Sequence, residues 1–449
     1  MSRKSLVGLT PQIKEKLIQQ SLERRLRQGS AAEVPLHRFA EMAAGNAAIP
    51  EQYYRFDKHP GYQQLRILAD GAAQLGIDSP YFKPHDGIAG GRTRIGGREY
   101  LNFSSYNYLG LSGHPMIAAA AKGAIDRYGT SVSASRAVSG ERPLHRELET
   151  AIANAYGTQD AVAFVSGHAT NVTTIGYLFG PRDLVLHDEL IHNSTLQGIA
   201  LSGARRLPFA HNNWEALDAL LSQQRHQFER VLIVIEGIYS MDGDFPELPR
   251  FIDIKRRHKA FLMIDEAHSF GVMGAAGLGV REHFGLQGAD VDIWMGTLSK
   301  ALAGCGGYIT GETALIEHLK FLAPGFLYSV GMAPPVAAAS LAALECLRRE
   351  PQRAATLRER GALFLKLARE TGVNTGTSAG LAVIPAIVGC SMRAARLSAA
   401  LFERGINVQP ILYPAVPEKL ARLRFFMSCE HSEADIREAV ARLATELAR

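Results

Sequence analysis

The chain has 449 residues, of which 47% are hydrophobic and 21% are charged. This composition is ordinary for a globular protein and excludes collagen, a long coiled coil and a wholly disordered chain. The formal net charge of +5 at pH 7 is a small excess for this length. The basic clusters are short, as at Arg205-Arg206 and Arg256-Arg257, so we expect solvated faces and no nucleic-acid partner.

The first 50 residues are predicted to form a basic helix and a linker. Apolar residues recur at helical spacing from Ile13 to Leu26 among Lys and Arg side chains, after Thr10-Pro11, which can start a helix. The simpler interpretation is an arm that packs on the main body or on a second subunit. The alternative is a docking helix for an acidic protein.

No membrane span is expected, because no apolar stretch reaches the roughly 18 residues that a span requires. The N-terminus also lacks the apolar core of a signal peptide. The four cysteines are scattered, without the spacing of a zinc site. We interpret them as buried thiols in a reducing compartment, which predicts a cytoplasmic protein without a metal site.

From Tyr100 onward, short apolar runs alternate with longer helical patterns, which predicts βαβ units and a mostly parallel sheet. The predicted strands are 161–165, 183–186, 231–235, 261–264 and 291–295.

Past Pro334-Pro335 the pattern changes to a long Ala- and Leu-rich helix, two short strands at 382–388 and 424–427, and a last helix from about Ser432. We therefore expect an α/β fold with three parts. These are an N-terminal helix and linker (1–50), a large domain (51–335) and a small C-terminal α+β domain (336–449).

Polar side chains follow the predicted strands, and the carboxyl ends of parallel strands meet at one edge of a sheet. Strand 161–165 runs into Ser166-Gly167-His168, a glycine turn that opens a helix and offers free N–H groups to an anion. The other strands lead to His187 and His192, to the Glu236–Ser240 segment, to Asp265-Glu266-Ala267-His268, and to Gly296-Thr297-Leu298-Ser299-Lys300.

Each feature alone has a structural explanation, because glycine turns, buried histidines and capping aspartates are common. Together, an anion cradle, an acid, histidines and a lysine fit pyridoxal 5′-phosphate (PLP). The lysine can form a Schiff base, and a carboxylate keeps the pyridine nitrogen protonated. The Asp265–His268 segment also matches the acidic box of helicase-type ATPases, but the sequence contains no G-x-x-x-x-G-K-[ST] phosphate loop.

With these motifs in this order, the chain resembles the α-oxoamine synthases over about residues 100–445. These are fold-type I PLP-dependent transferases that include 8-amino-7-oxononanoate synthase and serine palmitoyltransferase. The resemblance implies a homodimer with a shared active site. It also implies decarboxylative condensation of serine, alanine or glycine with an acyl thioester, giving an α-amino ketone and CO2.

The resemblance implies roles for individual residues. Lys300 would hold the cofactor and remove the α-proton of the amino acid, and Asp265 would pair with the pyridine nitrogen. His268 would contact the phenolic oxygen of the cofactor, with Ser240 nearby, and His192 would stack on the ring. The other expected cofactor-binding residues are Ser166, Gly167, His168, Thr297 and Ser299, with Ser329 from the neighbouring subunit.

For the substrates, the resemblance implies that Arg424 binds the carboxylate of the amino acid, near Tyr106 and Asn107. The Tyr-Asn-Tyr-Leu-Gly and Asp-Glu-Ala-His-Ser motifs look more like serine palmitoyltransferase, which favours serine. Ala415 stands where relatives often carry Thr and points to a different acyl donor. The donor is expected to be acyl-CoA or, given the basic N-terminal helix, an acyl carrier protein.

Two other functions remain open. A PLP-dependent aminotransferase or aldolase would use the same fold and cofactor. A non-catalytic partner subunit of such a synthase is disfavoured by the intact Lys300, Asp265 and His192. The choice among small amino acids rests on one or two atoms of a pocket, which a sequence does not reveal.

Overall fold

The computed structural model describes residues 49–74 and 78–449. The chain divides into two compact units, Met1–Phe82 and Lys83–Arg449. The basic helix expected between residues 10 and 26 lies outside the described residues. The described elements of the first unit are two short 3-10 helices and one α-helix: η1 (Glu51–Tyr53), η2 (Phe56–Lys58) and α3 (Pro60–Gln74).

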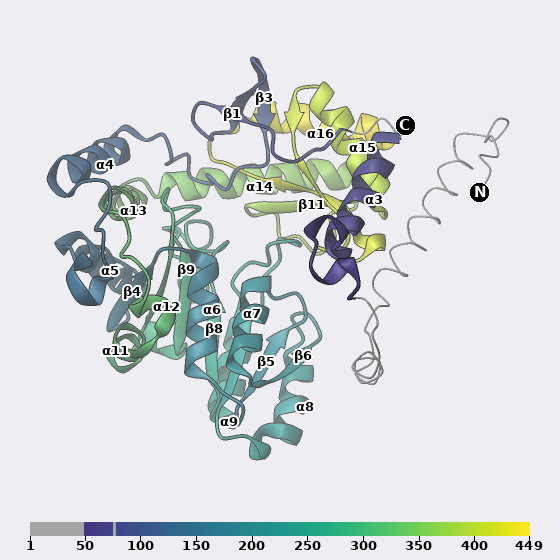
Figure 1. Cartoon of the computed structure of the whole chain (residues 1–449). Helices are drawn as coiled ribbons and strands as arrows, with labels where there is room; N and C mark the ends of the chain where they lie inside the picture. The colour runs from purple at the N-terminus through teal and green to yellow at the C-terminus, as the bar shows by residue number, and fades with distance from the viewer. Residues whose placement is uncertain (1–48, 75–77) are drawn as a thin grey trace. The chain divides into compact units, whose positions relative to one another are not determined.

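The second unit contains a seven-stranded sheet with the order β4-β10-β9-β8-β7-β5-β6 (Figure 1). Its strands are β4 (Asp160–Phe164), β5 (Leu184–Asp188), β6 (Arg205–Phe209), β7 (Val231–Glu236), β8 (Phe261–Asp265), β9 (Ile293–Thr297) and β10 (Gly307–Gly311). Strand β10 runs antiparallel to both neighbours, and the other paired strands are parallel. The predicted α/β fold with a mostly parallel sheet is confirmed.

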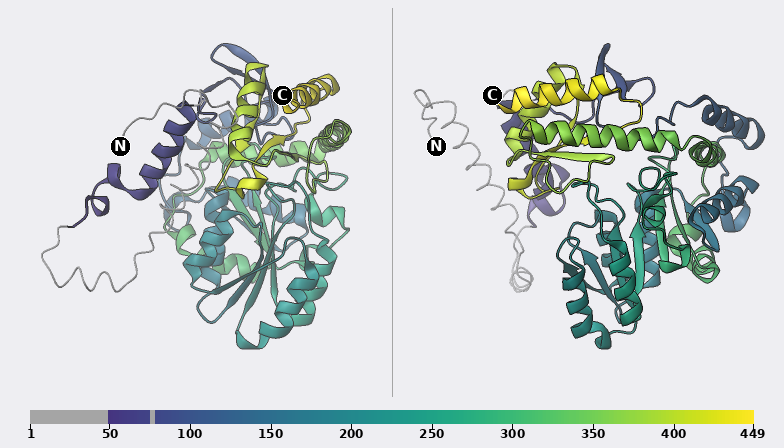
Figure 2. Two further views of the ribbon diagram at one scale, coloured as in Figure 1. Left: turned by 90° about the vertical axis from the view of Figure 1, so that its right-hand side faces the viewer. Right: turned by 180° about the vertical axis from the view of Figure 1, so that it is seen from behind.

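Both faces of this sheet are packed, which is why its inner strands are largely apolar. In β7, Ile233 and Ile235 belong to one buried apolar cluster, while Leu232 and Val234 belong to another. Helices lie on both sides of the sheet (Figure 2). These helices are α5 (Pro143–Tyr156), α6 (Gly167–Leu178), α7 (Asn193–Ser202), α8 (Trp214–Gln224), α9 (Leu248–His258), α10 (Gly279–His283), α11 (Thr313–Leu322) and α12 (Pro324–Leu327).

Two strands of the large sheet were not predicted. Strand β6 lies at the edge of the sheet, where Arg205 and Arg206 are exposed, so it lacks an apolar run. Strand β10 follows glycines that resemble a flexible segment. A Cβ at Gly296 would lie 2.1 Å from the Tyr308 side chain, so glycine here allows β9 and β10 to pack closely.

The remaining helices of the second unit are α4 (Pro115–Tyr128), α13 (Pro334–Arg349), α14 (Gln352–Glu370), α15 (Ser391–Glu403) and α16 (Glu433–Leu447). A three-stranded antiparallel sheet has the order β11 (Val383–Ile387), β14 (Arg422–Phe426) and β13 (Gln409–Ile411). A second small sheet has the order β1 (His85–Asp86), β2 (Arg92–Ile95), β3 (Arg98–Asn102) and β12 (Ile406–Asn407). The α+β character of the C-terminal region is confirmed, and it shares a sheet with residues 85–102.

The cysteine interpretation is only partly correct. All four cysteines are free, and Cys346 is buried, but Cys305 is exposed in the turn between β9 and β10. Within residues 49–74 and 78–449, the helices are too short or too polar to cross a membrane.

Candidate active site

A cavity of about 340 Å³ lies where β4, β7, β8 and β9 end. This is the edge at which a mostly parallel sheet is expected to gather functional side chains. All predicted site residues except Asn107 and Ser329 line it: Tyr106, Ser166, Gly167, His168, His192, Ser240, Asp265, His268, Thr297, Ser299, Lys300 and Arg424.

Lys300 follows β9 and carries its amine into this cavity. Burial lowers the pKa of Lys300 to about 8, although the nearby Asp265 carboxylate acts in the opposite direction. Its Nζ lies 5.4 Å from the centre of the Tyr106 ring. Roughly a tenth of such an amine is unprotonated at pH 7, which suits it to attack a carbonyl or to accept a proton.

Asp265 ends β8 and is 4% exposed. Its Oδ2 accepts a hydrogen bond from Asn171 Nδ2 at 2.8 Å, and its Oδ1 accepts one from the Ala267 N–H at 3.0 Å. In the described part of the chain no basic side chain forms an ion pair with it. A buried acid without a cationic partner is costly, and this one suits the protonated ring nitrogen of PLP.

A chain of hydrogen bonds joins this acid to His192. The Nδ1 of His192 lies 2.7 Å from Ser194 Oγ, which also accepts from Asn171 Nδ2 at 2.9 Å. Burial lowers the pKa of His192, so its imidazole is mainly neutral at pH 7 and can lie flat against an aromatic ring. Sequence patterns gave Asn171 and Ser194 no role, because a lone amide or hydroxyl carries no distinctive signal.

His268 is buried beside Tyr108 and lines the cavity. Its Nδ1 lies 2.7 Å from Tyr108 Oη, and burial holds the pKa of His268 well below its ordinary value. The imidazole is therefore neutral and fixed in orientation, with Nε2 left for the cavity. Tyr108 was not predicted as a site residue, since it looks like an ordinary core aromatic.

The start of α6 forms an anion cradle. Ser166 caps the helix, and its Oγ accepts from the Ala169 N–H at 3.3 Å. The N–H groups of Gly167 and His168 belong to the first turn and have no helical acceptor. A Cβ at Gly167 would lie 2.9 Å from Thr297 Oγ1, so glycine allows this turn to approach β9. Together with Lys300 and Asp265, this cradle fits PLP.

Arg424 lies on β14 and brings its guanidinium to the cavity. One nitrogen donates to the Ser240 carbonyl at 3.1 Å, and the group lies 4.6 Å from the centre of the Phe426 ring. Its Nε is buried and has no hydrogen-bond partner. Because no carboxylate of the described residues pairs with it, this guanidinium is available to an anion from outside the protein.

Asn107 does not line the cavity, in contrast to its neighbour Tyr106. The Oδ1 of Asn107 accepts from the Leu111 N–H at 2.8 Å and the Ser112 N–H at 3.2 Å, and its Nδ2 donates to the Ala89 carbonyl at 2.7 Å. The amide therefore stabilises the 107–112 turn. Of the two residues, Tyr106 lines the cavity and Asn107 does not.

Two further predicted positions also lie outside the cavity. His187 is within β5 rather than after it, is buried, and has its Nδ1 2.7 Å from the Asp188 carbonyl. Ser329 follows the exposed Tyr328, and its hydroxyl donates to the Val330 carbonyl at 3.3 Å. Its predicted role requires a neighbouring subunit.

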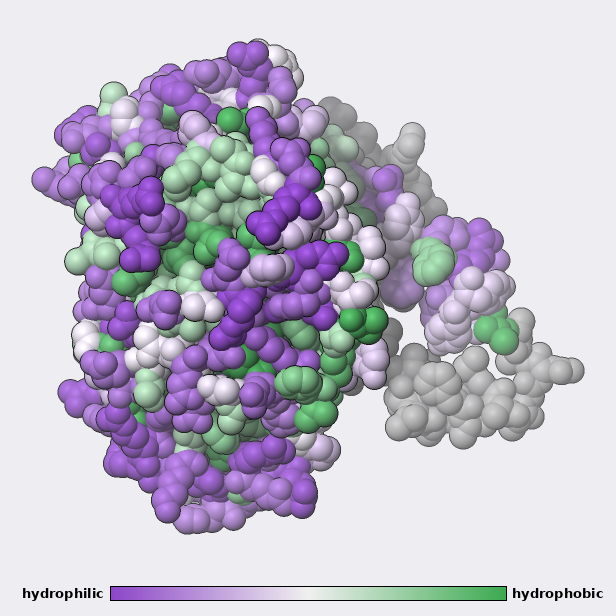
Figure 3. All heavy atoms as spheres, turned by 90° about the vertical axis from the view of Figure 1, so that its left-hand side faces the viewer, coloured by the Kyte–Doolittle hydropathy of each residue, from purple (hydrophilic) through white to green (hydrophobic). Residues whose placement is uncertain are grey.

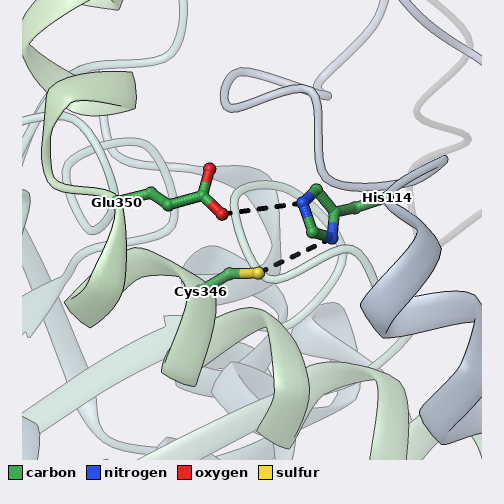
Figure 4. Close-up of side chains that lie close together, drawn as sticks. All are labelled: His114, Cys346 and Glu350. Carbon is green, nitrogen blue, oxygen red and sulfur yellow. Dashed lines mark hydrogen bonds and ion pairs between the residues drawn. The ribbon is translucent and has the colours of Figure 1, made fainter.

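A separate cluster of His114, Cys346 and Glu350 lies at the start of α4 and the end of α13 (Figure 4). The imidazole contacts Cys346 Sγ through Nδ1 at 3.7 Å and Glu350 through Nε2 at 3.6 Å. Its two nitrogens thus face different partners, and burial raises the pKa of the Cys346 thiol. We interpret this cluster as a link between the two helices.

Comparisons with known proteins agree with this geometry. Residues 98–443 match the family Aminotransferase class I and II. The 8-amino-7-oxononanoate synthase of Geobacter sulfurreducens is 41% identical over 366 residues, which cover 80% of this chain and 91% of that protein. Serine palmitoyltransferase of Sphingomonas wittichii is similar in structure, with a TM-score of 0.82, 28% identity, and coverage of 86% of this chain and 97% of that one. A second serine palmitoyltransferase structure, which contains PLP, has a TM-score of 0.81 and 26% identity, with coverage of 86% and 97%.

The chain therefore belongs to the aminotransferase class I and II family and has the fold of its PLP-dependent transferases. Within that family it is an α-oxoamine synthase, a PLP-dependent acyltransferase. The predicted family, fold, cofactor and enzyme class are confirmed.

Proposed function

We propose that Lys300, Asp265, His192, His268 and Arg424 carry the decarboxylative condensation of a small amino acid with an acyl thioester. One observation supports this most directly. The guanidinium of Arg424, which has no carboxylate partner among the described residues, lines the same cavity as the amine of Lys300, whose pKa is lowered to about 8. A carboxylate-binding group and a proton acceptor are thus both available to one amino acid.

PLP, when bound, supplies an electron-accepting ring that stabilises negative charge on the α-carbon of the amino acid. Arg424 binds the carboxylate and orients the amino acid. Lys300 accepts the α-proton at Nζ, and Asp265 keeps a proton at the ring nitrogen. His192 and His268, both mainly neutral, shield the cavity from water and fix the ring.

The overall reaction balances without a further reactant. A carbon–carbon bond forms between the α-carbon and the acyl carbonyl, and the carbon–sulfur bond of the thioester breaks. The α-carboxylate leaves as CO2, and the products are the amino ketone and the free thiol. An aminotransferase would instead need a keto acid as second substrate, so dependence on a thioester separates the two reactions.

The candidates for the amino-acid substrate are serine, alanine and glycine. The motifs favour serine, whereas a relative at 41% identity is an 8-amino-7-oxononanoate synthase. The test is the visible absorbance of the PLP-bound enzyme during titration with each amino acid, followed by CO2 release after addition of an acyl-CoA. A specific absorbance change and thioester-dependent CO2 release support the proposal. No change with any amino acid would contradict it.

We also propose a homodimer with a shared active site. Exposed apolar side chains gather on two segments that a hydrogen bond from the Gly331 N–H to the Ala134 carbonyl, 3.0 Å long, holds side by side. We call this set the loop patch: Val138, Phe321, Leu322, Tyr328 and Val330. Large exposed apolar patches mark protein contacts. Ser329 lies within this patch, which supports its predicted contribution to a neighbouring site.

A second apolar surface supports the same proposal. A groove of about 1050 Å³ lies between α4, α5 and α13, lined largely by Ala, Leu and Met side chains. Figure 3 shows apolar side chains on the face that carries these helices. Light scattering of the purified protein would measure the mass directly, and a monomeric mass would contradict the dimer.

For the acyl donor, we propose a thioester attached to an acyl carrier protein, on the basis of the basic sequence between residues 10 and 26. Removal of residues 1–45 should then weaken turnover with a carrier-bound donor while leaving turnover with acyl-CoA unchanged. Unchanged turnover of the carrier-bound donor by the truncated enzyme would contradict this. The free cysteines agree with the proposed cytoplasmic location.

A further inference from the structure

Glu236 is a cavity residue to which the proposed mechanism gives no role. It ends β7 directly beside Asp265, its register partner on β8. Its side chain lines the cavity, and the residue is 3% exposed. Two acidic side chains therefore lie next to each other at the edge of the sheet, in surroundings that exclude most water.

The two oxygens of Glu236 are used unequally. Oε2 accepts one long hydrogen bond, 3.3 Å, from the Ser240 N–H. Oε1 is buried and has no partner. An ionised carboxylate in such surroundings needs several good donors or a cation in contact with it. The donors near Glu236 are the backbone N–H groups of Ser240 and His192, and no basic side chain of the described residues forms an ion pair with it. Burial and the adjacent Asp265 accordingly hold the pKa of Glu236 well above its ordinary value.

Glu266 shows what a structural buried glutamate looks like in this protein. It lies outside the cavity, one residue after β8, and is fully buried. Its Oε1 accepts from the Val280 N–H at 2.8 Å, and its Oε2 accepts from Tyr156 Oη at 3.2 Å. The protein satisfies both oxygens of Glu266, whereas it leaves one oxygen of Glu236 without a partner beside the cavity.

The groups around Glu236 are Asp265 on β8, Lys300 after β9, His192 before α7 and Arg424 on β14. Among the described residues, Arg424 has no carboxylate partner, although Glu236 lines the same cavity. A charged Glu236 would compete with an incoming carboxylate for that guanidinium. A neutral Glu236 leaves Asp265 as the one negative group of the cavity wall.

We propose that Glu236 is a binding residue of this site, a neutral carboxylic acid whose free oxygen donates its hydrogen to an oxygen of the molecule bound in the cavity. The acceptor is an anionic or carbonyl oxygen, a chemistry that PLP and the carboxylate of an amino acid share. This inference rests on the proposed function for the identity of those molecules. The neutral state of Glu236 can be measured without them.

The first experiment is infrared spectroscopy of the full-length protein without PLP, in which a protonated carboxylic acid has its own carbonyl band. The difference between the wild type and Glu236→Gln isolates the Glu236 band, because Glu266 is present in both proteins. We expect this band to persist from about pH 5 to neutral pH, a range in which an ordinary glutamate side chain is ionised. Its absence, or its loss within that range, would overturn the neutral state.

The second experiment adds PLP and then the amino acid to the same sample. A downward shift of the Glu236 band on addition of PLP places the acceptor on the cofactor, and a shift only on addition of the amino acid places it on the substrate. A band that both additions leave unchanged would overturn hydrogen-bond donation. If wild-type protein binds PLP but no amino acid, the proposed function fails while the neutral acid of Glu236 stands.

The affinity for the bound ligand distinguishes a hydrogen-bond donor at position 236 from a side chain that only fills space. Glu236→Gln retains a neutral N–H donor of similar size and should change the Kd of the affected ligand by less than about threefold. Glu236→Leu lacks a donor and should weaken binding by roughly tenfold. Glu215→Gln, on the exposed surface of α8, is the matched control. Thermal unfolding checks that the Leu variant is folded. If the folded Leu variant bound the ligand as tightly as the Gln variant, the proposal would be overturned.

Discussion

Arg422 and Arg424 lie two residues apart on β14, and their side chains have different partners. Arg422 is buried and donates to Asp242 Oδ1 at 2.6 Å. Arg424 has a buried Nε without a partner and contacts the Ser240 carbonyl and the Phe426 ring. The same side-chain type thus serves as a structural ion pair at one position and as an open cationic group at the other.

Substitution of Arg424 should impair binding of the amino acid and leave the cofactor in place. We expect Arg424→Ala to raise the KM for the amino acid by roughly 100-fold, because a charge-assisted, bidentate contact is lost. Absorbance titration of the PLP-bound variant measures the affinity directly. Arg424→Lys should recover only part of the loss, since an ammonium cannot form the paired contact.

Arg422→Ala is the matched control for this prediction. It removes a buried ion pair and leaves Asp242 without its partner, so the free energy of unfolding should fall by roughly 3 kcal/mol. Urea unfolding measures that loss. If Arg422→Ala raised the KM as much as Arg424→Ala did in folded protein, the assignment of the open guanidinium to substrate binding would be wrong.

The lowered pKa of Lys300 predicts how cofactor loading depends on pH. Only the unprotonated amine attacks the aldehyde of PLP. The rate at which cofactor-free enzyme is loaded should therefore rise with pH and level off, with the midpoint of the rise at about pH 8. Stopped-flow absorbance measures this rate. Lys300→Ala should abolish covalent attachment.

Asp265→Asn tests the cause of that midpoint. Asp265 raises the pKa of Lys300 against the effect of burial, so removal of its charge should shift the midpoint to lower pH. Glu215→Gln, which lies on exposed surface, should leave the midpoint unchanged. A midpoint for the wild type near the ordinary lysine value would show that the Lys300 amine is not desolvated.

The sequence predicted β4, β5, β7, β8 and β9 and the residues that follow them, because both depend on local signals. The apolar runs ended close to the structural strand ends, so Asp265, Lys300 and Ser166 were placed at the correct edge. The side-chain direction of neighbouring residues in a turn is not a local signal. Tyr106 and Asn107 were therefore both expected at the substrate site. The structure shows that the Asn107 side chain instead accepts hydrogen bonds within the 107–112 turn.

The roles of Glu236 and Asn171 depend on contacts between distant segments, which a motif does not record. Asn171 joins Ser194 and Asp265 through its Nδ2. Glu236 differs from Glu266 in what surrounds its second oxygen. Such distinctions arise from packing, and a single sequence provides no signal for them.

His211 predicts a pH dependence of stability away from the cavity. Burial opposes its charge, but hydrogen bonds to Asp188 at 2.9 Å and Asp244 at 3.0 Å raise the pKa of His211 to about 10. A folded pKa above the unfolded value of about 6.5 stabilises the protein fully below that pH. The stabilisation is lost as the pH rises through about 10.

Replacement of His211 by Gln should therefore lower the free energy of unfolding by roughly 3 kcal/mol near pH 6.5, because two buried carboxylates lose their cation. The difference from the wild type should shrink toward pH 10. Urea unfolding at several pH values measures it. His226→Gln, at an exposed position in η4 (Arg225–Gln227), is the control, and an equal, pH-independent loss in both variants would contradict the prediction.

Shared active sites predict that two inactive variants restore activity when mixed. Lys300→Ala removes the cofactor lysine, and Ser329→Asp places a negative charge where the neighbouring phosphate is expected. Each homodimer should be inactive. In a heterodimer, one site combines an intact Lys300 with an intact Ser329, whereas a site built within one chain would contain a defect in every copy.

Unfolding and refolding an equal mixture should recover about a quarter of the wild-type activity, since half of the dimers are heterodimers and one of their two sites is intact. Tyr328→Asp in the loop patch should lower the mass to that of a monomer, measured by light scattering, and weaken PLP binding with it. Complementation between the Lys300 and Ser329 variants requires that these two residues meet only across the interface. A mixture without activity, from two variants that each form dimers, would place Ser329 outside the site.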